Sequence, residues 1–88
     1  MDEELLEKIN QKISETLSKK DEIKQIIKTL DTLNADKKSF TYGIIIGRLY
    51  NSFYYQSKRI LNREPTDEEF AEFLKILKKY ESDFLGSF

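Results

Sequence analysis

The stretch FTYGIIIGRLYNSFYYQSKR, residues 40–59, holds six aromatic residues of a chain that has five Tyr and six Phe, and it contains no carboxylate. On a helical wheel its apolar residues occupy more than half of the circumference. They are Tyr42, Ile46, Leu49, Tyr50, Phe53 and Tyr54, followed by Ile60 and Leu61. A helix that is apolar over so wide an arc is expected to contact two or more neighbours. We therefore predict a central helix over residues 40–62, with Ser39 as its N-cap.

Two of the three glycines, Gly43 and Gly47, lie inside this predicted helix, four residues apart. Each glycine in a helix interior costs about 1 kcal/mol relative to alanine, so some other contact should compensate for it. Small residues at this spacing let another helix approach closely. The spacing therefore predicts that a neighbouring helix packs against Gly43 and Gly47.

The residues before the central helix keep one heptad register, carried by Leu6, Ile9, Ile13, Ile23, Ile27 and Leu30. This register predicts one continuous helix over residues 3–33. The alternative is a break near residues 18–21, with Asp21 as the cap of a second helix. We favour the continuous helix, because an unrelated second helix would have no reason to keep the same register.

The residues after the central helix carry strong stop and start signals. Pro65 disfavours a helical conformation at the residue before it, which ends the central helix. Thr66 and Glu69 have the spacing of a capping box, so a third helix should begin at residue 67. We predict this helix over residues 67–82, with 83–88 a short apolar tail that either folds back or contacts a partner.

The segment NREPTDEEFAEFL, residues 62–74, resembles the loop and helix start found in many helical DNA-binding proteins, including bacterial sigma factors. Those proteins carry a glycine where Asn62 stands here. The resemblance implies a helix start and no function, because no recognisable recognition helix follows it.

The composition restricts the fold and the chemistry. The chain has 88 residues, of which 35% are charged and 39% hydrophobic, with three Gly and one Pro. This balance predicts a single all-α domain, a small antiparallel bundle of three helices. The chain has no His and no Cys. Zinc sites, disulfides, cysteine nucleophiles and imidazole bases are therefore excluded, and we predict no enzyme activity, no cofactor and no metal.

No apolar run approaches the ~20 residues that a membrane-spanning helix needs. The longest purely aliphatic run is Ile44–Ile46. We therefore predict a cytoplasmic protein that is not inserted in a membrane.

The charges are distributed unevenly along the chain. Residues 37–63 contain six basic residues and no acidic residue, whereas the overall pI is about 5.5. On the wheel Arg48, Arg59 and Arg63 share one side, with Tyr55 beside them and Lys58 close in sequence. This basic face could bind nucleic acid or another anion. The other interpretation is that acidic residues of the neighbouring helices pair with it.

The predicted helices differ in length, which would leave part of the first helix uncovered within one chain. An uncovered apolar stripe favours association with a second copy or another protein, through the first helix and the tail. We predict a non-enzymatic protein-interaction or self-association module, most simply a homodimer. The alternative is a small nucleic-acid-associated protein that uses the basic face. Solvent-exposed, unpaired Arg48, Arg59 and Arg63 would favour this alternative.

Overall fold

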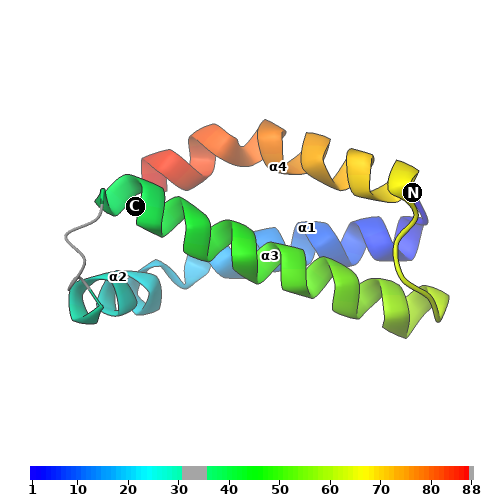
Figure 1. Cartoon of the computed structure of the whole chain (residues 1–88), viewed down its shortest axis with the longest axis horizontal. Coiled ribbons are helices and arrows are strands. Elements are labelled where there is room, and N and C mark those ends of the chain that lie inside the picture. Colours follow the sequence, from blue (N-terminus) through cyan, green and yellow to red (C-terminus); the bar gives the residue numbers. More distant parts are fainter. Residues whose placement is uncertain (31–35, 88) are drawn as a thin grey trace.

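The computed structural model describes residues 1–30 and 36–87. It contains helices α1 (Glu3–Ser18), α2 (Lys20–Thr29), α3 (Lys37–Leu61) and α4 (Asp67–Ser87), and these described residues form no strand (Figure 1). The all-α class is thus confirmed. The number of helices is four and not the predicted three, because the first predicted helix is divided in two.

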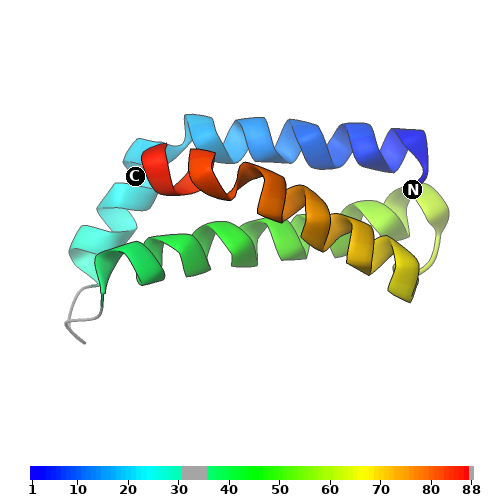
Figure 2. The same cartoon turned by 90° about the horizontal axis from the view of Figure 1, so that it is seen from above.

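Helix α3 is the centre of the molecule. Helices α1, α2 and α4 all pack against it, and α1 makes the most extensive contact. Helix α1 runs antiparallel to α3, and α4 runs in the same direction as α1 and lies between α1 and α3 in the view of Figure 2. The wide apolar arc of residues 40–62 is explained by these three neighbours.

The core draws on all four helices. Its buried hydrophobic residues are Leu5, Ile9 and Ile13 of α1, Ile23 and Ile27 of α2, Ile45, Leu49 and Phe53 of α3, and Phe73, Leu77 and Phe84 of α4. The rings of Phe53 and Phe73 stack with their centroids 4.3 Å apart and an angle of 11° between their planes. This stack joins α3 to α4 in the middle of the core.

The predicted continuous helix over residues 3–33 is wrong, and the alternative break near 18–21 is correct. Lys19 leaves the helix, and its N–H donates to the carbonyl of Thr16 at 3.1 Å. In the same turn the Thr16 and Ser18 hydroxyls donate to the carbonyls of Lys12 and Glu15, at 2.8 and 2.7 Å. Hydroxyl groups that bond to the backbone compete with the regular helix, and two of them adjoin this break.

The new helix begins without a capping side chain, so the predicted role of Asp21 is wrong. It ends at Thr29, and the predicted end at residue 33 lies outside the described residues. The break turns α2 towards the start of α3 (Figure 2). Ile23 and Ile27 stay buried there, whereas Leu6 and Leu30 of the same predicted stripe are 36% and 60% exposed. The stripe of the first segment is therefore covered within the chain only in part, and its role in dimerisation stays a prediction.

Helix α3 begins three residues earlier than predicted, and its N-cap is Asp36, not Ser39. The Asp36 carboxylate accepts the N–H of Lys38 at 3.0 Å and the Ser39 hydroxyl at 3.0 Å. The helix ends at Leu61, because Asn62 adopts the left-handed conformation with φ 58°. Asn tolerates this conformation better than most residues.

The predicted capping box is confirmed. The N–H of Glu69 donates to the Thr66 hydroxyl at 3.2 Å, and the N–H of Thr66 donates to the Glu69 carboxylate at 2.9 Å. Helix α4 extends to Ser87 and not to residue 82, so residues 83–87 form helix and not a separate tail. Phe84 is buried in the core within this extension, while Phe88 lies outside the described residues.

Candidate interaction surface

One side of α3 is unusual because it carries no charge between Phe40 and Tyr54. Arg48 is the one charged residue between Ser39 and Ser57, in a chain that is 35% charged. On this side an outer row of residues, Phe40, Gly43, Gly47, Tyr50 and Tyr54, recurs at alternating spacings of three and four. Such spacing is typical of residues along a helix–helix contact. The core of this chain uses a different row, which includes Ile45, Leu49 and Phe53.

The outer row is at least partly accessible along its length. Gly43 and Gly47 are exposed, Phe40 and Tyr54 are half-buried, and Tyr50 is 46% exposed. A Cβ atom at either glycine would meet no other atom within 4 Å. Within the described chain no helix packs closely on Gly43 and Gly47, so the predicted contact is wrong for a neighbour in the same chain. A contact with a second molecule stays a prediction.

Aromatic side chains continue this surface from α3 onto α4. The ring of Tyr50 lies 5.0 Å from that of Tyr54 and meets Phe70 of α4 edge-on, with centroids 6.2 Å apart. Leu74, one turn after Phe70, is 48% exposed. The outer row of α3 together with Phe70 and Leu74 therefore forms one apolar surface, which we name the aromatic face.

Polar contacts fix α4 beside α3 at the other end of this face. The Tyr42 hydroxyl donates to the Glu81 carboxylate at 3.1 Å, and Lys78 pairs with Glu81 at 3.1 Å. Partial burial and the carboxylate acceptor both raise the pKa of Tyr42. The tyrosine therefore stays protonated and keeps the relative position of the two helices.

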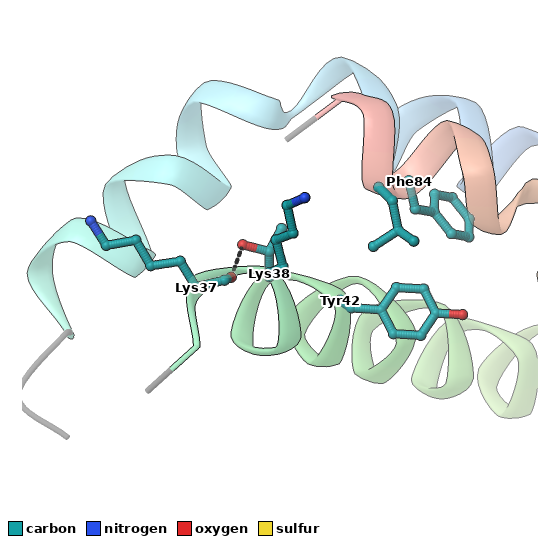
Figure 3. A pocket seen from close by; sticks show the side chains of 6 residues that line it. Lys37, Lys38, Tyr42 and Phe84 are labelled. Carbon is teal, nitrogen blue, oxygen red and sulfur yellow. Dashed lines mark hydrogen bonds between the residues drawn. The ribbon is translucent and has the colours of Figure 1, made fainter. Parts of the chain in front are cut away.

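A pocket lies next to this contact, between the start of α3 and the end of α4 (Figure 3). Lys37, Lys38 and Tyr42 line it from α3, and Phe84 from α4 (Figure 3). Its volume of about 50 Å³ has room for only a few water molecules. Substrate pockets usually measure several hundred Å³, so this one gives no support to an enzyme.

The cations of the predicted basic face differ in whether they have an acidic partner. Arg63 donates to both carboxylate oxygens of Glu69, at 2.7 and 3.2 Å, and Lys58 pairs with Glu64 at 3.8 Å on the surface. These two cations therefore have acidic partners in the same molecule. The interpretation as an internally paired face is correct for Arg63 and, more weakly, for Lys58.

Arg48, Tyr55 and Arg59 remain as a smaller group on the same side of α3. Arg59 donates to Gln56 at 2.9 Å, and neither arginine forms an ion pair with any described residue. Tyr55 is 62% exposed. The pKa of Glu15 is lowered mainly by its hydrogen bond with Lys12, and Arg48 adds only a smaller, long-range attraction.

The described residues contain neither a metal-binding cluster nor a membrane-spanning helix. No group of three or more acidic, His or Cys side chains there could hold a metal ion. None of the four helices is long and apolar enough to cross a membrane.

Comparison of the chain with protein-family models, curated proteins and solved structures gives no match. The aromatic face and the two arginines Arg48 and Arg59 are therefore the features from which a function can be inferred.

Proposed function

We propose that this chain is a non-enzymatic protein-interaction module, in which the aromatic face receives a helix of a partner protein. The observation that carries the proposal is the uncharged outer row of α3, with its two open glycines. The cores of protein interfaces are depleted in charged residues and enriched in aromatic ones. The outer row has both properties, and none of its residues belongs to the fully buried core, although Phe40 and Tyr54 pack against that core with part of their surface.

Each part of the face has a physical role in such a contact. Gly43 and Gly47 leave space for the backbone of a partner helix, which explains two helix-destabilising residues in the middle of α3. Tyr50 and Tyr54 offer large apolar rings beside this space, while their hydroxyls can reach water at the edge of the contact. Leu74 extends the apolar area onto α4.

Photo-crosslinking from the face would test the proposal. A benzoylphenylalanine residue is introduced at Tyr50 in the cells that make the protein, and at Asn10, an exposed position of α1, as the control. We expect a discrete protein adduct from position 50 and not from position 10. The adduct should disappear when Gly47→Arg places a charged side chain in the open space. Absence of an adduct from position 50, or an equal one from position 10, would contradict the proposal.

A second candidate function is binding of single-stranded nucleic acid along Arg48, Tyr55 and Arg59. It is favoured by the two arginines without a carboxylate partner among the described residues and by the exposed ring of Tyr55. Arginines would contact phosphates, and the ring would stack on a base. The chain's pI of about 5.5 is low for a nucleic-acid-binding protein, which places this candidate second.

A titration with a labelled oligonucleotide at low and moderate salt tests this second candidate. Phosphate contacts require binding that weakens steeply with salt. The double substitution Arg48→Gln and Arg59→Gln should abolish binding, whereas Lys75→Gln on the exposed side of α4 should not. A chain that does not bind at low salt would eliminate this function.

A further inference from the structure

We propose that the helix received by the aromatic face is α3 of a second copy of the chain, packed antiparallel and crossing at Gly47. This inference rests on the proposed function, because it names the partner of the same face. Three properties of the molecule support it: the equal spacing of Phe40 and Tyr54 from Gly47, the distribution of charge between the two ends, and the size of the long side.

The two ends of the outer row lie at equal distances from Gly47 along the sequence. Phe40 lies seven residues before Gly47 and Tyr54 seven residues after it. An antiparallel pair related by a two-fold axis at Gly47 therefore places Phe40 of each copy opposite Tyr54 of the other. The two Gly47 residues meet at the axis, where the absence of side chains lets the backbones approach. A two-fold contact of this kind buries the same surface on both copies and closes at two chains.

The charges at the two ends of the molecule have opposite sign. The starts of α1 and α4 lie at the same end, together with the end of α3 (Figure 1). The described residues of that end carry nine carboxylates and four cationic side chains: Asp2, Glu3, Glu4, Glu7, Glu64, Asp67, Glu68, Glu69 and Glu72 against Lys8, Lys58, Arg59 and Arg63.

The opposite end holds α2 and the start of α3 (Figure 1). Its described residues carry six lysines and three carboxylates: Lys19, Lys20, Lys24, Lys28, Lys37 and Lys38 against Asp21, Glu22 and Asp36. The last turns of α4 add equal numbers of both signs. Two copies packed side by side in antiparallel orientation bring each acidic end next to a basic end. A parallel pair would place like charges together, which is unfavourable.

The molecule is also large enough for this contact, provided that most of one side takes part. Its extents are 39 × 21 × 21 Å, so one long side projects about 800 Å². A stable protein interface takes about that area from each partner. We therefore expect a dimer whose interface includes Phe70 and Leu74 of α4 in addition to the outer row of α3.

Single cysteines can test the arrangement, because the natural chain contains none. Gly47→Cys should form a disulfide-linked dimer in air, whereas Asn10→Cys on the exposed side of α1 should not. Mixing Phe40→Cys with Tyr54→Cys should give the mixed dimer in preference to either self-linked one. A parallel pair would instead link position 40 to position 40. The wild-type mass by light scattering should be twice the 10.5 kDa of one chain. Gly47→Arg should weaken association by about tenfold or more.

The possible outcomes separate this inference from the function on which it rests. A wild-type mass of one chain at millimolar concentration would overturn the dimer. If Tyr50 nevertheless crosslinks in cells to a different protein, and the adduct is lost with Gly47→Arg, the interaction function stands and only the identity of the partner is wrong. If benzoylphenylalanine at position 50 crosslinks neither to a second copy of the chain nor to another protein, both proposals fail. Self-linked products at position 40 without mixed products would overturn the antiparallel geometry.

Discussion

Arg63 donates two hydrogen bonds to the carboxylate of Glu69, at 2.7 and 3.2 Å, across the turn that joins α3 to α4. The same carboxylate accepts the N–H of Thr66 at 2.9 Å, so one side chain both caps α4 and holds the residue that follows α3. Glu69 is buried, and a buried carboxylate with these partners is strongly favoured in its charged form. This turn therefore has a defined geometry.

Replacing Glu69 with Gln should lower the free energy of unfolding by about 2 kcal/mol, because it removes a charge-assisted bond and weakens the capping box. Urea denaturation followed by circular dichroism measures the change. Glu68→Gln, at an exposed position in the same turn, is the control and should have little effect. Equal stability of the two variants would contradict the structural role of Glu69.

The same carboxylate should make stability depend on pH in the acid range. The bond from Arg63, followed by the N–H of Thr66, lowers the pKa of Glu69 from 4.5 to about 2. Since the pKa is lower in the folded state, this stabilisation is complete above about pH 4.5 and is lost as the pH falls towards 2. The difference in stability between wild type and Glu69→Gln, measured at several pH values, should shrink over that range. A difference that stays constant down to pH 2 would show that ionisation of Glu69 does not contribute.

Gly43→Ala and Gly47→Ala should each raise the free energy of unfolding, by up to about 1 kcal/mol. Both sites are helical and have space for a methyl group, so alanine gains helix propensity without a clash. The reverse change, Ala71→Gly at an exposed position of α4, should lower stability by a similar amount. Thermal unfolding in dilute solution measures all three. Destabilised alanine variants would mean that something already occupies this space.

Core and surface aromatic residues of α3 should respond differently to truncation. Phe53→Ala removes a ring that is 1% exposed and stacked on Phe73, and it should cost about 3–5 kcal/mol. Tyr50→Ala removes a ring that is 46% exposed, so its effect on the folding of one chain should be below about 1.5 kcal/mol. Denaturation at low protein concentration, where any dimer is dissociated, gives the comparison. Similar losses of stability at the two positions would contradict the assignment of Phe53 to the core and of Tyr50 to the exposed outer row.

Much of the fold could be predicted because its signals are local. Thr66 and Glu69 form their capping box within one turn, and the wide apolar arc of residues 40–62 requires neighbours on several sides. The break at Lys19 could not be read from the heptad pattern, since Ile23 and Ile27 keep the same register in a straight or a bent helix. The extension of α4 did have a signal, because Phe84 continues the spacing of Phe73, Leu77 and Tyr80.

The candidate site was harder to predict than the fold. Spacing shows that Gly43 and Gly47 share one side of a helix, but not whether that side faces a neighbour or solvent. Pairing of Arg63 depends on which carboxylate the α3–α4 turn brings near it, and this is a property of three-dimensional geometry. The absence of charge along residues 39–57, apart from Arg48, is a sequence signal that could have indicated the aromatic face.

Gly43 and Gly47 also bear on how long the protein persists in the cell, because they lower the stability of α3. Together they cost about 2 kcal/mol of helix stability, which raises the unfolded fraction of an isolated chain roughly 30-fold. Covering the outer row in a complex stabilises the folded state by mass action. Proteases attack mainly the unfolded fraction, so chains without a partner should be degraded faster than associated ones. The amount of this protein in the cell would then depend on the amount of the partner that binds α3.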